Sequence, residues 1–269
     1  MSYARIAQVA MLLLAAEYVF LEPAVAAVSY VNAPGIQGVD PTPGYPGAMA
    51  ASSVTITPHE LTIIKSIDPA SPQLFAAIAM GTPLGTVSTL FYNGVPAGPP
   101  DATLSFFNSL GSSIQSLDAT TVLVRFNAQN PLALFLEVPG IPGESNAPGH
   151  PNIMYIRSFE LVGNEFRIGR APDSASDDLF LANAMGVQFP FARLILSDST
   201  LPDISVDAVV EFHNLLIRSS QVLGHLNEPI ELHKFNFATL SQVPEPVSVA
   251  LAAVAGILAA RMRRGVRGR

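Results

Sequence analysis

The residues best suited to chemistry in this 269-residue chain are five histidines, and their spacing does not write a metal site. None belongs to an H-x-x-x-H or H-E-x-x-H pattern, which would put two ligands on one face of a helix. The chain has no cysteine, so thiolate ligands and disulfides are excluded as well. We therefore predict no metal and no cofactor. The histidines are His59, His150, His213, His225 and His233.

Acidic residues are the second group that could do chemistry. Asp68 and Asp173 each precede a stretch with helical spacing. A catalytic carboxylate would need a partner acid or base at a suitable distance, whereas an aspartate before a helix commonly forms the turn that starts it. The stretch DSASDD lacks the spacing of a calcium loop, and no G-x-S-x-G, phosphate-loop or dinucleotide pattern is present. We predict no catalytic residue and no enzyme, and keep a cryptic matrix hydrolase as the second alternative.

The elements that would position these residues come in two copies. PGIQGVDPTPGYPG from Pro34 matches PGIPGESNAPGHPN from Pro139, and DPASPQLFAAIAMG from Asp68 matches DSASDDLFLANAMG from Asp173. At this offset of 105, 20 of the 54 positions from 34 to 87 are identical, where chance gives about four. A further match, DATLSFFN against DAVVEFHN, follows at an offset of 106. The sequence therefore predicts a tandem duplication, with domains at 27–130 and 131–241.

Each copy predicts several strands and one short helix. Stretches such as VTIT, VSTLFY and ARLILS have the alternation or β-branched content of strands, and turn residues separate them at short intervals. Ser71 is placed as the N-cap of the first helix, with Ser176 in the same role in the second copy. Gly81 and Gly186 mark the two helix ends. We expect an all-β dominated fold of two tandem β-barrels, each covered by its helix.

The duplication also bears on the histidines. His150 lies in a Gly-rich loop, where it could be a ligand, an acid or base, or an imidazole that bonds to backbone carbonyls. Tyr45 holds the equivalent position in the first copy, and Phe107 is equivalent to His213. Since an aromatic ring replaces each histidine, we expect these positions to serve packing.

The second copy resembles the haemolysin-coregulated proteins (Hcp), which form the tube of type VI secretion. That family opens with a strand, a G-I-x-G-E-S loop, a G-H pair and a strand around an S-F pair, followed later by a D-x-x-S pattern before a helix. In the first copy Val39, Asp40 and Tyr45 depart from this opening. The matching residues are Gly140, Ile141, Gly143, Glu144, Ser145, Gly149, His150, Ser158 and Phe159.

The resemblance implies Hcp-like barrels that self-associate. In that family single barrels form six-membered rings and the rings stack into a tube. Three copies of this chain would supply six barrels, so a trimeric ring or tube component linked to type VI secretion is the first alternative for its function.

The N-terminus has the layout of a secretory signal peptide. Arg5 is followed by an apolar stretch from Ile6 to Ala16, and an A-x-A cleavage site then ends at Ala26. We predict a signal peptide over 1–26 that directs the protein to the Sec export route and is then removed by signal peptidase. The predicted cleavage residues are Ala24 and Ala26.

The C-terminal segment 242–269 has three parts in order: a Pro-Glu-Pro motif, the uncharged run from Val247 to Ala260, and a cluster of arginines. The fourteen residues of this run give about 21 Å of helix, which is short for a bilayer core. A tail anchor and a terminal helix of the globular body are the alternatives to a sorting signal. The motif is Val243, Pro244, Glu245 and Pro246, and the basic cluster is Arg261, Arg263, Arg264, Arg267 and Arg269.

This segment resembles the PEP-CTERM sorting signal of Gram-negative bacteria. The resemblance implies transient insertion in the inner membrane and processing near the motif by an exosortase, followed by release to the cell surface or the exopolysaccharide matrix. Between the two predicted cuts the body carries 8 Lys and Arg against 19 Asp and Glu, which disfavours nucleic acid as a partner. We predict a non-enzymatic, exported surface protein that associates with itself or binds matrix components such as exopolysaccharide.

Overall fold

The computed structural model describes residues 26–38, 40–42, 45–128, 131–147, 150–198, 206–224 and 229–243. Within them the protein is mostly β with two helices, in agreement with the predicted fold class. The signal-peptide residues 1–25 and the tail from Pro244 onward lie outside these residues, so the predictions made for them stay predictions. Within the described part, no helix is long and apolar enough to cross a membrane.

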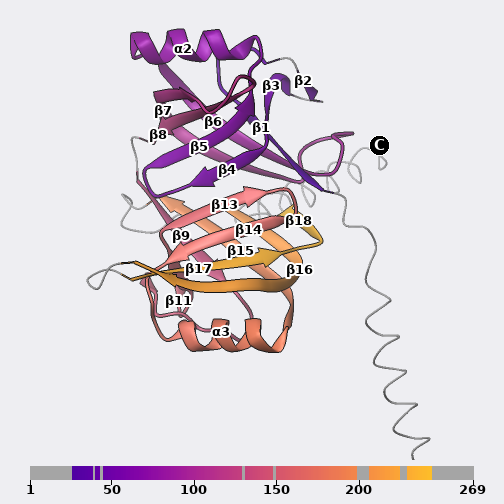
Figure 1. Ribbon diagram of the computed structural model, residues 1–269, viewed down its shortest axis with the longest axis vertical. Coiled ribbons are helices and arrows are strands. Elements are labelled where there is room, and N and C mark those ends of the chain that lie inside the picture. The colour runs from indigo at the N-terminus through magenta and orange to yellow at the C-terminus, as the bar shows by residue number, and fades with distance from the viewer. Residues whose placement is uncertain are drawn as a thin grey trace, which may run out of the picture.

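Each of the two copies contributes one helix and a set of antiparallel strands (Figure 1). The first copy comprises β1 (Ala27–Asn32), β2 (Asp40–Thr42), β3 (Tyr45–Ala51), β4 (Ser53–Ile56), β5 (Glu60–Ser66), α2 (Ala70–Met80), β6 (Pro83–Asn93), β7 (Ala102–Ser116) and β8 (Thr121–Asn127). The second comprises β9 (Leu132–Glu137), β10 (Asn146–Ala147), β11 (His150–Pro151), β12 (Met154–Ile156), β13 (Ser158–Val162), β14 (Glu165–Arg170), α3 (Ala175–Met185), β15 (Gln188–Asp198), β16 (Val206–Leu223), β17 (Ile230–Asn236) and β18 (Thr239–Gln242).

The strand order repeats from one unit to the other. It runs β4-β5-β8-β7-β6-β1-β3 in the first unit and β13-β14-β17-β16-β15-β9-β12 in the second. The two helices and most of the paired strands begin 105 residues apart, as the sequence repeat does. Alternating burial along β5, β8 and β17 shows one side chain in two pointing into the core, which is the period of a strand with one solvated face.

A bent strand helps each sheet to curl toward closure. In the first unit β3 pairs with β1 and the next strand, β4, pairs with β5, so the chain changes neighbours at Ser52. The backbone N–H of Ser52 donates to the carbonyl of Ile64 across the bend at 2.8 Å. The same bond joins Arg157 to Gly169 in the second unit, at 2.7 Å. Each unit thereby forms a curled barrel-like sheet, with its core on the inside.

The longest strand of each unit also changes neighbours along its length. β7 pairs first with β6 and then with β8, and β16 pairs first with β15 and then with β17. Asn108 lies at a register shift of the β6–β7 ladder, and Asn214 is skipped between two pairs of the β15–β16 ladder. Both have left-handed φ angles, of 51° and 55°. Asparagine tolerates this region better than most residues, so it accommodates the irregularity that bends the strand.

Each helix covers one end of its unit, and its start differs from the predicted N-cap. The helices begin at Ala70 and Ala175, so Ser71 and Ser176 lie inside the first turn. The carboxylate of Asp68 accepts the N–H groups of Ala70 and Ser71 at 3.0 and 3.2 Å, and the Ser71 hydroxyl accepts the N–H of Asp68 at 3.2 Å. This reciprocal pair takes the place of a serine cap. The predicted glycine ends are confirmed, because Gly81 and Gly186 are both left-handed.

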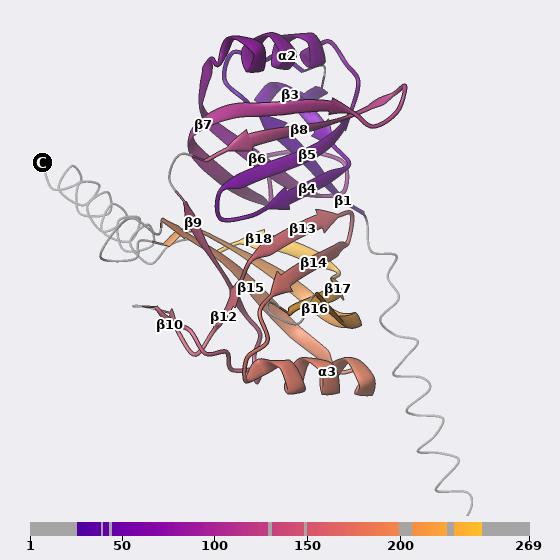
Figure 2. The same cartoon turned by 60° about the vertical axis from the view of Figure 1, so that its left-hand side comes forward.

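The two units join edge to edge through β4 and β13, and their helices lie at opposite ends of the molecule (Figures 1 and 2). At the offset of 105, Thr55 is equivalent to Glu160, and these two residues face each other in the ladder. Val54 faces Leu161, which is the equivalent of Ile56, and Ile56 faces Phe159, which is the equivalent of Val54. Exchanging the two units therefore reproduces the same pairs. This is the pattern of a two-fold contact. The pairs are Val54–Leu161, Thr55–Glu160 and Ile56–Phe159.

The last strand strengthens the seam between the units. β18 pairs with β16 of its own unit and packs against β6 and β7 of the other. The side-chain amide of Asn93 donates to the carbonyl of Leu240 at 2.8 Å and accepts the N–H of the same residue at 2.9 Å. The N–H of Gln242 donates to the carbonyl of Asp101 at 2.8 Å. The two barrels are therefore held by backbone ladders and specific amide bonds.

Candidate functional sites

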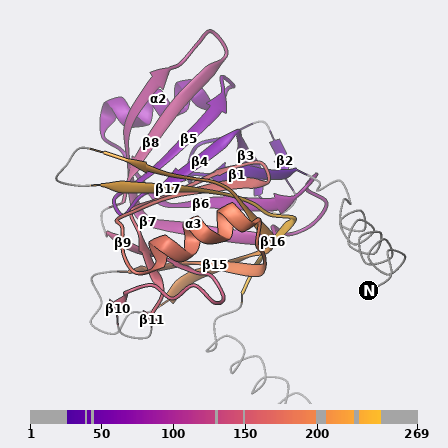
Figure 3. The same cartoon turned by 60° about the horizontal axis from the view of Figure 1, so that its bottom comes forward.

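The most concentrated set of ionisable groups is a buried cluster beneath α3, which crosses the end of the second unit (Figure 3). Arg170 at the end of β14 has no exposed surface and donates to the carboxylate of Glu231 on β17 at 3.0 Å. It also pairs with Asp173, whose carboxylate accepts the N–H of Ala175 at 2.7 Å. Ser176 donates to Glu231 at 3.0 Å. The cluster thus ties the start of the helix to two strands.

The first unit has a simpler version of the same cluster. Lys65, equivalent to Arg170, is 1% exposed, and its ammonium donates to Asp68, Ser71 and the carbonyl of Ser66 at 2.5, 3.1 and 2.8 Å. All three of its protons are therefore used. Val122 faces Lys65 in the ladder, where Glu231 faces Arg170. The two aspartates that the sequence offered as possible catalysts start helices, which is the role we favoured, and they also pair with buried cations, which the sequence analysis did not predict.

His233 is the histidine most firmly enclosed by the fold. It has no exposed surface, its Nδ1 lies 2.9 Å from the Ser220 hydroxyl, and its Nε2 lies 3.3 Å from Glu231. The ring of Phe180 on α3 meets it edge-on, with centroids 5.4 Å apart. Burial lowers the pKa of His233, with a smaller contribution from the Arg170 charge, while Glu231 opposes the shift. The imidazole is therefore neutral at physiological pH.

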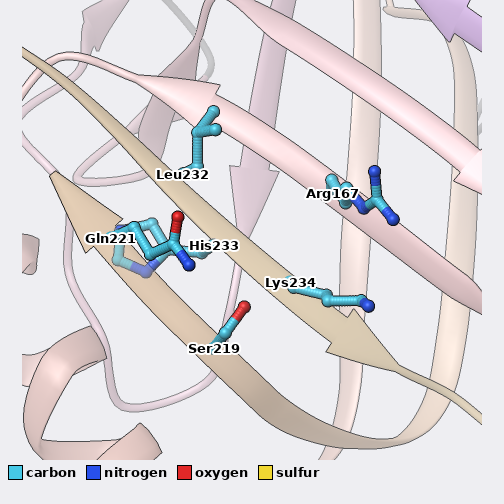
Figure 4. Close-up of a pocket in the computed structure, with 6 residues that line it drawn as sticks. All are labelled: Arg167, Ser219, Gln221, Leu232, His233 and Lys234. Atoms are coloured by element: carbon cyan, nitrogen blue, oxygen red, sulfur yellow. The ribbon is translucent and has the colours of Figure 1, made fainter. Parts of the chain in front are cut away.

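A shallow groove of about 260 Å³ lies on the outer face of the same sheet (Figure 4). Arg167 and Lys234 face each other on neighbouring strands along it. Their charges are already matched, because Arg167 lies 3.0 Å from Glu165 and 3.3 Å from Glu160, and Lys234 lies 2.6 Å from Glu165. The groove is thus a neutralised polar surface. It is lined by Arg167, Ser219, Gln221, Leu232, His233 and Lys234.

Carboxylates in the described residues come together around arginines. Arg167 contacts Glu160 and Glu165, Arg170 contacts Asp173 and Glu231, and Arg193 contacts Glu137 and Glu211. Burial alone would raise the pKa of Glu165, but hydrogen bonds from Lys234 and Arg167 outweigh it and hold that pKa below its ordinary value. A glycosidase-type general acid needs the opposite shift. These arrangements have the geometry of structural ion pairs.

The glycines of the G-I-x-G motif are explained by the backbone. Gly35 and Gly140 have left-handed φ angles of 77° and 82°. A Cβ on Gly38 would lie 2.4 Å from the carbonyl oxygen of Ala48, and one on Gly143 would lie 2.4 Å from the backbone of Ile153. The loop therefore crosses a strand too closely for any other residue. Ile36 and Ile141 between these glycines are buried.

The same loop is tied to the helix of its unit. The carboxylate of Glu144, from the G-E-S part of the motif, accepts the backbone N–H of Ser174 at 3.0 Å. In the first unit, Gln73 on α2 accepts the N–H of Gln37 at 3.0 Å. The motif positions thus build the loop and anchor it against the helix. A second cavity, of about 300 Å³, lies beside this loop and is lined by residues 137–142 and 151–153.

The predicted site residues are spread over the molecule. Ala26 is exposed directly before β1, and the N–H of Val243 donates to the carbonyl of Val209 at 3.0 Å. Ala24, Pro244, Glu245, Pro246, the arginine cluster and His225 lie outside the described residues. His213 lies 3.0 Å from the Ser241 hydroxyl and so links β16 to β18. His150 begins β11, as Tyr45 begins β3.

No group of histidines and acids in the described ranges could hold a metal ion.

The sequence analysis missed the buried cluster beneath α3, although the sequence contains a signal for it. A basic residue stands three positions before the aspartate and six before the serine in both copies, at Lys65 and Arg170, inside an otherwise apolar or small stretch. Glu231, the partner of Arg170, and His233, which contacts Glu231, are about 60 residues away in the chain, and the β14–β17 ladder brings them to Arg170.

No protein-family model and no curated protein matches this sequence. Among solved structures, Hcp1 from Salmonella typhimurium is 22% identical and matches with a TM-score of 0.38 over 40% of this chain and 82% of its own. Hcp2 from the same organism is 24% identical, with a TM-score of 0.36 over 41% and 84%. The secreted protein Hcp3 from Pseudomonas aeruginosa is 12% identical, with a TM-score of 0.36 over 45% and 94%. These similarities concern the fold and assign no activity, partner or assembly to this protein.

Proposed function

We propose that this chain is a non-enzymatic structural protein that works by self-association, as a component of an Hcp-like ring or tube. The observation that carries the proposal is the two-fold seam between β4 and β13. The motif residues that the two units share have structural explanations, as turns, close crossings, helix starts and buried ion pairs. The seam, by contrast, joins one barrel to another.

The seam has the character of a subunit interface placed within one chain. Each unit brings the same strand edge, and an unpaired edge is a ready surface for another chain. Fusing the units pairs both edges and joins them further through Asn93 and the strap formed by β18. One chain is therefore equivalent to a closed pair of barrels, and any larger assembly has to use other surfaces.

The two-fold relation changes the stoichiometry expected for a ring. Neighbouring barrels in a six-membered ring are related by a sixth of a turn about one axis, whereas the two barrels of this chain are related by half a turn. A ring made from this chain therefore takes one barrel from each copy. Six chains would then form two rings back to back, in place of the single ring of three chains that was the first alternative in the sequence analysis.

Export and sorting belong to the same proposal and rest on the sequence. The Val243 N–H makes a backbone bond to Val209, and the Pro-Glu-Pro motif follows at once. An enzyme of the exosortase type would process the chain at this motif, as the PEP-CTERM resemblance implies. We propose that Sec export and this processing deliver the barrels to the cell surface. Binding to exopolysaccharide remains a prediction of the PEP-CTERM resemblance.

Native mass spectrometry and negative-stain electron microscopy of the protein from its own cells and medium test the proposal. We expect oligomers whose barrels form hollow rings, at six chains for each pair of rings. A protein that stays monomeric at high concentration would overturn the ring proposal. Intact masses that begin near Ala27 and end near Glu245 would support export and sorting, whereas a retained Arg269 in the membrane fraction would show an anchor.

A further inference from the structure

The end of the molecule covered by α2 presents exposed apolar side chains on and beside a helix without charged residues, a surface that we call the α2 pole. The helix ASPQLFAAIAM contains no charged residue. Phe75 and Met80 point outward and are 62% and 74% exposed. Ile67 and Leu117, 49% and 47% exposed, lie at the same end, where the N–H of Ile67 donates to the carbonyl of Thr120 at 2.7 Å. The exposed Asp118 follows Leu117 and is the charged residue at the edge of this group. Exposed apolar side chains gathered in this way are typical of interaction surfaces.

The duplication has kept several of these outward apolar positions. Met185, equivalent to Met80, is 63% exposed, and Leu223, equivalent to Leu117, is 47% exposed. Ala79 and its equivalent Ala184 are also both exposed. The two poles therefore share these outward apolar positions, so a difference in binding between them has to come from the other residues of each helix.

The opposite end, the α3 pole, differs in charge. Asp177 and Asp178 stand in the first turn of α3 and are exposed, where α2 has proline and glutamine. Phe180, the equivalent of Phe75, packs edge-on against His233 and is only half-buried. Covering this pole with another protein would desolvate two carboxylates, which costs free energy unless a cation pairs with them. Two α3 poles would also bring four aspartates together.

We infer that the α2 pole binds the α2 pole of a second copy of this chain. Two uncharged helices can pack against each other symmetrically, because neither helix brings an ionised group that the contact would desolvate. The body of each chain has a net negative charge, and a contact through α2 joins two such bodies at helices that carry no charge themselves. The contact is small, so it forms at high concentration or within a larger assembly. The inference rests on the proposed self-association and names the surface that joins one pair of barrels to the next.

Cross-linking tests the pairing directly, since the chain has no cysteine of its own. Ala79→Cys places a thiol on the exposed face of α2, and Ala184→Cys is its matched control on α3. Under oxidation of the full chain we expect disulfide-linked dimers from Ala79→Cys alone. Dimers from Ala184→Cys alone, or only from a mixture of the two variants, would overturn the inference, because they indicate contact through α3 or head-to-tail contact.

Sedimentation equilibrium of charge variants completes the test. Phe75→Asp with Met80→Asp should raise the dissociation constant of the pole contact at least tenfold, while Leu181→Asp with Met185→Asp on α3 should leave it unchanged. All four side chains are exposed, so circular dichroism should show unchanged folding. If oligomers persist unaltered in the α2 variant, this surface is wrong and the proposed self-association stands. If the wild-type chain never associates, both fail.

Discussion

Arg170→Met tests whether the buried cluster beneath α3 holds the second barrel together. The substitution keeps the apolar part of the side chain and removes the charge between Glu231, which is 3% exposed, and Asp173. Breaking a buried pair by removing one partner typically costs about 3–5 kcal/mol, because it leaves an uncompensated buried charge. For a body of this size 1 kcal/mol corresponds to about 2–4 °C, so we expect the melting temperature to fall by about 6–20 °C.

Two further variants separate the charge effect from packing. Arg170→Met with Glu231→Val gives the second unit the neutral neighbour that Val122 provides opposite Lys65, and should recover most of the loss. Lys65→Met in the first unit leaves only Asp68, whose side chain is 13% exposed, so its cost should be smaller, about 1–3 kcal/mol.

Chemical and thermal unfolding followed by circular dichroism measures all of these variants. Where a variant shows more than one transition, each transition is fitted by itself. The reasoning is refuted if Arg170→Met costs no more than Lys65→Met, or if the double variant is no more stable than Arg170→Met alone.

Three further predictions follow from single positions. Because the pKa of His233 is lowered in the folded protein, the unfolded chain binds more protons than the folded one as the pH falls below 6.5. The free energy of unfolding should therefore decrease below that pH. His233→Val should flatten this dependence of the free energy of unfolding on pH, measured by urea unfolding between about pH 5 and 7. Asn214→Ala should cost about 1 kcal/mol through its left-handed φ, whereas Asn214→Gly should cost nothing measurable by the same assay. Gly143→Ala should cost about 1–3 kcal/mol, because its Cβ would overlap the Ile153 backbone; a wild-type melting temperature would contradict the close crossing.

The sequence by itself determined the features whose signals are local or repeated. The offset of 105 revealed the duplication, since related units keep the same spacing between their elements. Strand alternation and one short helical stretch for each copy predicted the mostly β class. Gly81 and Gly186 marked the helix ends, because a left-handed position strongly favours glycine.

Local spacing was less reliable at the helix starts. A serine followed by proline or an acid predicted the N-caps at Ser71 and Ser176. In the structure the aspartate three residues earlier accepts the first free N–H groups, and the serine returns a bond to it. The aspartate takes the capping role in place of the serine because it also pairs with a buried cation, which the preceding strand supplies.

Only the tertiary structure decided how the two units meet. The pairing of β4 with β13 depends on which strand edge each barrel leaves open, and nothing in the spacing of either strand specifies a partner 105 residues away. The same holds for Glu231 and His233, which join Arg170 through a ladder between distant strands. Sequence periodicity records which face of an element is buried, whereas the choice of partner is made when whole units pack, so the two-fold seam and the buried cluster follow from the fold alone.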